Sequence, residues 1–137
     1  ETQVMRYKLF TSDKDKANLA FLEDITLSAI GSTSNKNATD TISPRTTNGP
    51  SQSEKYTFQI LNTDIASITG TGGETGTFST DSRTQTVKSA AGVVVTINDL
   101  SVDTSRTIFQ TVVFVTGEQT GATRVVTIQN NSKGTFS

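Results

Sequence analysis

The chain has 137 residues, a length typical of one domain, and its formal net charge is only −1. It contains no Cys, no His and no Trp, which excludes disulfides, zinc–thiolate sites and catalysis by a thiol or an imidazole. Twelve basic and 13 acidic residues are scattered along the chain, so no basic stripe predicts nucleic-acid binding. No apolar run approaches the roughly 18 residues of a membrane helix, so we expect no membrane insertion.

The first part of the chain predicts a strand and then a short helix. Residues 4–10, "VMRYKLF", alternate apolar and charged side chains, which is typical of a half-buried strand. In the segment that follows, Ser12 precedes Asp13 and Asp15, a pattern that favours a short helix over residues 13–22, with a loop as the alternative. Residues 25–30, "ITLSAI", alternate again and predict a second strand.

Residues 31–55 predict a long polar loop. This segment holds both prolines of the chain, many Ser, Thr and Asn residues, and Ile42 as its single large apolar side chain. Structureless connections of this length are uncommon in compact domains. We therefore expect either a surface loop or an arm that orders against a neighbouring subunit.

Beyond residue 55 the apolar residues return in short alternating runs, such as "KYTFQIL" and "GVVVTIND". They predict half-buried strands, with Tyr56 and the earlier Tyr7 in the core rather than in a sugar-binding platform. The clearest segment, residues 109–130, predicts a hairpin that turns around Gly117 and Gly121. Its first strand is apolar on both faces, which is typical of a central strand covered on both sides. We place the β-forming Thr111, Thr127 and Gln129 on the outward positions of the hairpin.

These runs amount to about eight or nine short strands separated by Gly, Asn and Asp turns. They predict one all-β domain over residues 1–137, an antiparallel β-sandwich of Ig-like or jelly-roll type. The segment "TGATRVVTIQNNSKG", residues 120–134, is similar to the closing strand of a microbial Ig-like domain, over a length too short to define a family.

Little in the sequence indicates reactive chemistry. The Gly-rich "GTGGETG", residues 70–76, lacks the lysine and the following helix of a phosphate-binding loop, so it is interpreted as a connection between strands. Calcium is the one metal worth testing, because Asn98, Asp99 and Asp103 offer oxygen ligands near a strand end. We expect no other cofactor and no enzymatic activity.

The N-terminal strand suggests assembly. A strand at a chain end can complete its own sheet or add to the sheet of a neighbour, and repeated addition produces an open filament. We select the apolar side chains of residues 1–10 as candidate assembly residues: Val4, Met5, Tyr7, Leu9 and Phe10.

The sequence therefore favours a non-enzymatic structural subunit that binds copies of itself in a pilus-like extracellular filament or a surface layer. One alternative is a virion protein, such as a tail-tube, capsid or decoration protein. Another is an adhesin that binds a glycan or a host surface. Because the chain begins with Glu1, we expect that an export signal or a tag has been removed, and an export signal favours the cell surface over the virion.

Overall fold

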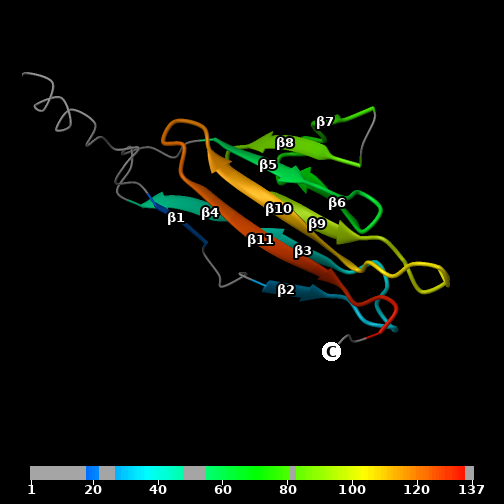
Figure 1. Ribbon diagram of the computed structural model, residues 1–137. Coiled ribbons are helices and arrows are strands. Elements are labelled where there is room, and N and C mark those ends of the chain that lie inside the picture. Colours follow the sequence, from blue (N-terminus) through cyan, green and yellow to red (C-terminus); the bar gives the residue numbers. More distant parts are fainter. Residues whose placement is uncertain (1–17, 22–26, 48–54, 81–82, 135–137) are drawn as a thin grey trace, which may run out of the picture.

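The computed structural model describes residues 18–21, 27–47, 55–80 and 83–134. Within these ranges every regular element is a strand and no helix occurs (Figure 1). The strands are β1 (Asn18–Phe21), β2 (Leu27–Ile30), β3 (Thr39–Ile42), β4 (Pro44–Thr47), β5 (Tyr56–Ile60), β6 (Ala66–Gly70), β7 (Thr77–Phe78), β8 (Gln85–Ser89), β9 (Val93–Ile97), β10 (Gln110–Gly117) and β11 (Thr123–Asn130). The prediction of an all-β fold is confirmed.

The strands form three sheets. Six strands lie in the order β2-β11-β10-β5-β8-β7, three in the order β3-β9-β6, and β1 pairs with β4 alone. Neighbouring strands are antiparallel, except that β2 runs parallel to β11. The Ig-like or jelly-roll connection stays a prediction.

Strands β10 and β11 form the hairpin that the sequence predicts. Val113 lies opposite Val126 in its register. At the turn, the N–H of Gly117 donates to the carbonyl of Ala122 at 2.8 Å, and the N–H of Gly121 donates to the carbonyl of Gly117 at 2.9 Å. Gly121 has a φ of 75°, a left-handed conformation that glycine adopts without steric cost. The turn thus fixes the register at the centre of the largest sheet.

The inward side chains of the two larger sheets form one hydrophobic core. In β5, the buried Tyr56, Phe58 and Ile60 alternate with half-buried polar residues, and β6, β8 and β9 show the same alternation. The rings of Tyr56 and Phe58 lie 6.4 Å apart, so Tyr56 is a core residue as predicted. Tyr7 lies outside the described residues.

The short helix predicted near residues 13–22 is a strand in its described part. Asn18 to Phe21 form β1, which pairs antiparallel with β4, Phe21 lying opposite Pro44. The other residues of the predicted helix lie outside the described ranges. The helix prediction rested on local capping signals, whereas the pairing with β4 comes from a distant segment, and such tertiary pairing overrides a weak local preference.

The long polar loop predicted over residues 31–55 contains two strands, so that prediction is wrong for the described part of the segment. β3 pairs with β9, and β4 pairs with β1. Ile42 is 1% exposed and belongs to the core, while Thr39 and Thr41 are exposed. β3 has a polar sequence because a single buried side chain holds it to the core and the remaining positions face solvent or the sheet edge.

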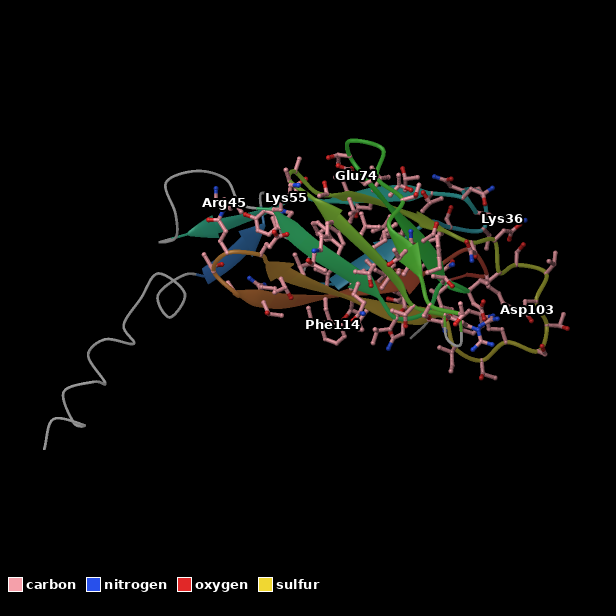
Figure 2. The ribbon with its side chains drawn as sticks, turned by 90° about the horizontal axis from the view of Figure 1, so that it is seen from above. Lys36, Arg45, Lys55, Glu74, Asp103 and Phe114 are labelled. Atoms are coloured by element: carbon pink, nitrogen blue, oxygen red, sulfur yellow. The ribbon has the colours of Figure 1, made fainter. Side chains whose placement is uncertain are left out.

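Strand β10 is central, as predicted, but it is not covered on both sides by the described residues. Val113 and Val115 are fully buried, whereas Val112 and Phe114 on the opposite face remain partly exposed. Figure 2 shows Phe114 projecting away from the strand on this outer side. Thr111 shares the inward face with Val113 and is 7% exposed, so its predicted outward position is wrong.

A buried asparagine ties the end of β11 to two loops. Asn130 is completely buried, and its Nδ2 donates to the carbonyls of Ile65 and Asn98, both at 2.8 Å. Its Oδ1 accepts the N–H of Ser132, and the Ser132 hydroxyl accepts the N–H of Leu100 at 2.9 Å. Because buried polar groups need partners, this network fixes the loops at the end of the sheets that lies opposite the hairpin turn.

Candidate functional site

The predicted assembly residues in the N-terminal strand lie outside the described residues. This holds for Val4, Met5, Tyr7, Leu9 and Phe10. The described residues do include the sheet edges that an added strand would have to join, and the outer surface of the six-stranded sheet. These surfaces, one hollow and the predicted calcium ligands are the candidate sites.

The outer edge of β6 is occupied by groups of the same chain. The Gln85 side chain reaches across from β8, and its Nε2 donates to the Ile68 carbonyl at 2.6 Å while its Oε1 accepts the Ile68 N–H at 3.0 Å. Further along, the Gly70 N–H donates to the Glu74 carbonyl at 2.7 Å. An incoming strand would have to displace these bonds, so this edge is closed.

The outer edge of β3 carries an acidic side chain. The Ala38 carbonyl bonds to Ile97 across the ladder, so by strand alternation the N–H of Thr41 points to the outer side. That N–H donates to Oδ1 of Asp40 at 2.8 Å. A charge at an edge discourages pairing with another strand, so β3 is also protected.

The six-stranded sheet ends in β7 on one side and β2 on the other. β7 has two residues, both exposed. β2 has four residues, and no strand of the described chain pairs with its outer side. β3 has the same length but carries Asp40 at its edge, so among the four edges of the two larger sheets β2 is the four-residue edge to which the described residues give no such protection.

Four apolar side chains gather on the outer face of the six-stranded sheet. Val125 is 43% exposed and lies opposite the half-buried Phe114 in the hairpin register. Leu61 is 41% exposed, and its N–H donates to the carbonyl of Val112 on the neighbouring strand. We call Leu61, Val112, Phe114 and Val125 the outer apolar cluster. Its immediate cross-strand neighbours are uncharged, namely Gln59 beside Phe114 and Thr127 beside Val112.

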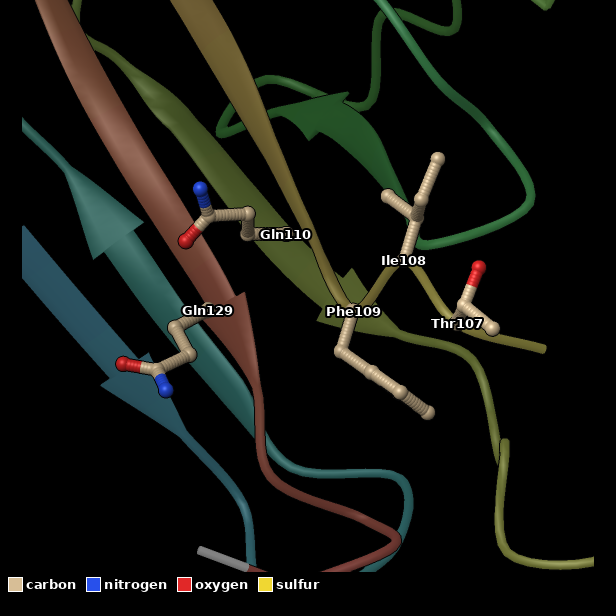
Figure 3. A pocket seen from close by; sticks show the side chains of 5 residues that line it. All are labelled: Thr107, Ile108, Phe109, Gln110 and Gln129. Carbon is tan, nitrogen blue, oxygen red and sulfur yellow. The ribbon is translucent and has the colours of Figure 1, made fainter. Parts of the chain in front are cut away.

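A hollow of about 330 Å³ lies at the start of β10, at the end of the hairpin remote from its turn. It is lined by Thr107, Ile108, Phe109, Gln110 and Gln129. Gln110 and Gln129 lie directly opposite each other in the register, and Figure 3 shows both side-chain amides on the same side of the two strands. No lining side chain is ionisable. Beside the hollow, the Nζ of Lys133 lies 5.9 Å from the centre of the Phe109 ring and donates to the Asp103 carbonyl.

The predicted calcium ligands do not converge. The Asn98 Nδ2 donates to the carbonyls of Thr63 and Asp64, both at 2.8 Å, so this amide is committed to the loop. Asp99 accepts the hydroxyl and the N–H of Ser101. Asp103 accepts from Nε of Arg106 at 3.0 Å. Over the described ranges, no three acidic residues gather where they could hold a metal ion.

The hydrogen bonds of these two aspartates change their acidity. The Ser101 hydroxyl lowers the pKa of Asp99 below its ordinary value, and its backbone N–H adds to the effect. The hydrogen bond from the Arg106 guanidinium lowers the pKa of Asp103. Arg106 also lies 3.5 Å from Oδ2 of Asp64, which Arg83 approaches to 2.6 Å. An ion-pair network therefore connects the loops that carry four side chains, those of Asp64, Arg83, Asp103 and Arg106.

Sequence reasoning identified only part of these surfaces. It noted the apolar outer positions of β10, but it did not select Leu61 or Val125, because alternation in single strands does not reveal which side chains meet across a sheet. It placed Gln129 outward without pairing it with Gln110. The hairpin register, which the turn around Gly117 and Gly121 determines, places Val125 beside Phe114 and Gln129 beside Gln110. Leu61 is found only from the pairing of β5 with β10.

In the described part of the chain, no helix has the length and hydropathy of a membrane span. Three comparisons, with protein family models, with curated proteins and with solved structures, find no match to this chain.

Proposed function

We propose that this protein is a non-enzymatic structural subunit that assembles with copies of itself, in a filament or a layer outside the cell. The observation that carries the proposal is the outer apolar cluster. The core is complete on the inward face, where Val113 and Val115 are fully buried, so the cluster contributes nothing to it. Clustered apolar side chains on a solvent-facing sheet favour contact with another protein surface.

A second copy of the chain suits this face for two reasons. The cluster spans three neighbouring strands and has uncharged neighbours, so two copies related by a two-fold axis would place apolar side chains against apolar side chains. The net charge of −1 also gives little repulsion between copies. Phe114 at the centre would be the main anchor, because aromatic side chains contribute large contact areas.

A two-fold contact alone yields dimers, and a filament needs a second contact. Strand addition by residues 1–10 to a neighbouring subunit would supply it, with β2 as the acceptor. This edge is favoured because Gln85 and Asp40 protect the edges of the three-stranded sheet, while β7 is only two residues long. A face contact combined with a head-to-tail contact gives an open assembly.

The test measures mass and shape over a range of protein concentrations. Light scattering after size exclusion, together with negative-stain microscopy, is applied to the full chain, to a Phe114→Thr/Val125→Thr variant and to a chain lacking residues 1–10. We expect filaments or layers from the full chain, short linear forms from the Thr variant and dimers from the truncated chain. Val102→Thr is the control, because Val102 is 83% exposed in a loop away from the cluster. A full chain that stays monomeric at every concentration would refute the proposal.

A further inference from the structure

The hollow beside β10 has the chemical character of a site for an uncharged ligand. Its volume of about 330 Å³ falls at the lower end of the roughly 300–1,000 Å³ of small-molecule pockets. None of its five lining side chains is ionisable, and the ammonium of Lys133 beside Phe109 already donates to the Asp103 carbonyl, so the lining itself favours neither a carboxylate, a phosphate nor an amine. Recognition here depends on hydrogen bonds from neutral groups and on apolar contact.

Two opposing glutamines supply the hydrogen-bonding groups. Gln110 and Gln129 face each other across the hairpin, and opposing residues of an antiparallel pair have Cβ atoms roughly 5 Å apart. Each amide presents two donor hydrogens and one acceptor oxygen. The described residues give neither side chain a hydrogen-bond partner. Two such amides match two adjacent hydroxyl groups, since each hydroxyl both donates and accepts.

The remaining lining residues supply apolar surface beside these amides. Ile108 is 58% exposed, Phe109 is half-buried, and both line the hollow with the exposed Thr107. Figure 3 shows Ile108 and Phe109 projecting from the chain in different directions; by strand alternation Ile108 belongs to the same face as Gln110, and Phe109 to the other face. Apolar surface of this kind accommodates the C–H face of a ring, while the amides hold its hydroxyl edge. Ring-shaped molecules with one apolar face and a hydroxylated rim are sugars.

We propose that this hollow binds a neutral carbohydrate of one or two sugar rings. Gln110 and Gln129 bind adjacent ring hydroxyls, and the exposed Ile108 contacts the apolar face of the sugar. This inference does not rest on the proposed assembly. A subunit that assembles outside a cell would display one such hollow per copy, and many weak sites in one assembly bind a polysaccharide far more tightly than a single copy does.

The test uses nuclear magnetic resonance on the full chain at a concentration where it is monomeric. The probes are glucose, galactose, mannose, N-acetylglucosamine, cellobiose and maltose, each titrated to its solubility limit. Sorbitol is the matched probe control, because it carries the hydroxyls without a ring face. We expect one or more sugars to shift the backbone signals of residues 107–110 and the side-chain NH₂ signals of Gln110 and Gln129, and sorbitol to shift them less.

Protein variants then assign the binding to the hollow. Gln110→Ala/Gln129→Ala should weaken binding about tenfold, which corresponds to about 1.4 kcal/mol. Gln59→Ala, on the same sheet but outside the hollow, should change it less than twofold. Unchanged thermal unfolding shows that the variants are folded. Absence of shifts with every sugar, shifts at other residues only, or full affinity in the double variant would each overturn the proposal. None of these results bears on self-assembly, which is scored by mass.

Discussion

The side chain of Gln85 pairs with Ile68 as a neighbouring strand would. Its amide donates to the Ile68 carbonyl at 2.6 Å and accepts the Ile68 N–H at 3.0 Å, and its Nε2 also donates to the Thr75 carbonyl at 3.0 Å. Gln85 belongs to β8 of the six-stranded sheet, whereas Ile68 belongs to β6 of the three-stranded sheet. One amide thus joins the two sheets and closes an edge.

Replacing Gln85 should destabilise the protein strongly. Gln85→Ala leaves the N–H and the carbonyl of the nearly fully buried Ile68 without partners, and two buried backbone groups without partners together cost about 2–6 kcal/mol. Gln59→Ala is the matched control, because Gln59 is half-buried and makes one long bond of 3.4 Å to Thr86; it should cost less than about 1 kcal/mol. Urea unfolding measures both, and equal losses would contradict this account of the edge.

Asn130 should tolerate no negative charge. In Asn130→Asp, the group that donates to the carbonyls of Ile65 and Asn98 is replaced by a carboxylate oxygen that repels them in a fully buried site. We expect a loss of about 3–5 kcal/mol in the free energy of unfolding, as for other buried charges without a partner. Asn37→Asp introduces the same charge at an exposed position and should have little effect. Thermal unfolding at neutral pH separates the two, and similar melting temperatures would refute the prediction.

Alanine substitutions at two glycines between β6 and β8 should distinguish the cost of a left-handed backbone from the cost of steric overlap. Gly73 and Gly76 both have left-handed φ angles, of 93° and 68°. A Cβ at Gly73 meets nothing within 4 Å, whereas a Cβ at Gly76 would overlap the carbonyl of Thr86. Gly73→Ala should cost about 1–2 kcal/mol for the left-handed conformation alone. Gly76→Ala should cost about 1–3 kcal/mol more, because β8 or the segment must shift. Chemical unfolding measures the free energy of unfolding of both variants. The prediction is wrong if Gly76→Ala is not the less stable of the two.

The ion pair of Asp103 and Arg106 should make stability depend on pH in the acid range. The Arg106 guanidinium lowers the folded-state pKa of Asp103 below its ordinary value of 3.8. The resulting stabilisation is present in full above the unfolded-state pKa and is lost as the pH falls through the folded-state pKa. Asp103→Asn should therefore lower the melting temperature at pH 7 and have a diminishing effect below about pH 4. In an Arg106→Gln background, the change in melting temperature caused by Asp103→Asn should depend less on pH. If its pH dependence stayed the same, a group other than Arg106 would be responsible for it.

Thr111 should be replaceable by valine without loss. Its Oγ1 is buried and has no hydrogen-bond partner among the described residues, and its side chain points inward beside the core. Thr111→Val keeps the shape and removes an unsatisfied hydroxyl, so we expect stability to be unchanged or raised by up to about 1 kcal/mol. Thr116→Val, at an outward position near Thr123, provides the comparison. A loss of more than about 1 kcal/mol at Thr111 would mean that its hydroxyl has a partner.

Alternation in the sequence predicted the strands that bury several apolar side chains. Tyr56, Phe58 and Ile60 define β5 in this way, and the long hairpin was recognised from its apolar runs and its glycines. β3 was missed because Ile42 is its one buried residue, and the pairing of its backbone with β9 leaves no pattern in the sequence. The role of Gln85 was also inaccessible, since a polar residue in a polar strand indicates exposure until the second sheet is placed beside it. Local sequence patterns therefore predicted the core residues. The protected sheet edges and the hollow could be identified only once the pairing between strands was known.

The parallel pairing of β2 with β11 has a consequence for synthesis on the ribosome. Ser28 lies opposite Ile128, so the two partners are separated by 100 residues of chain. β2 leaves the ribosome long before β11 exists, and Asn130, which ties two loops together, emerges about 100 residues after β2. Contacts between distant segments slow folding and leave strand edges exposed meanwhile. The nascent chain must therefore hold an unpaired β2 until β11 has been synthesised, and a neighbouring chain that supplies a strand during this interval would compete for that edge.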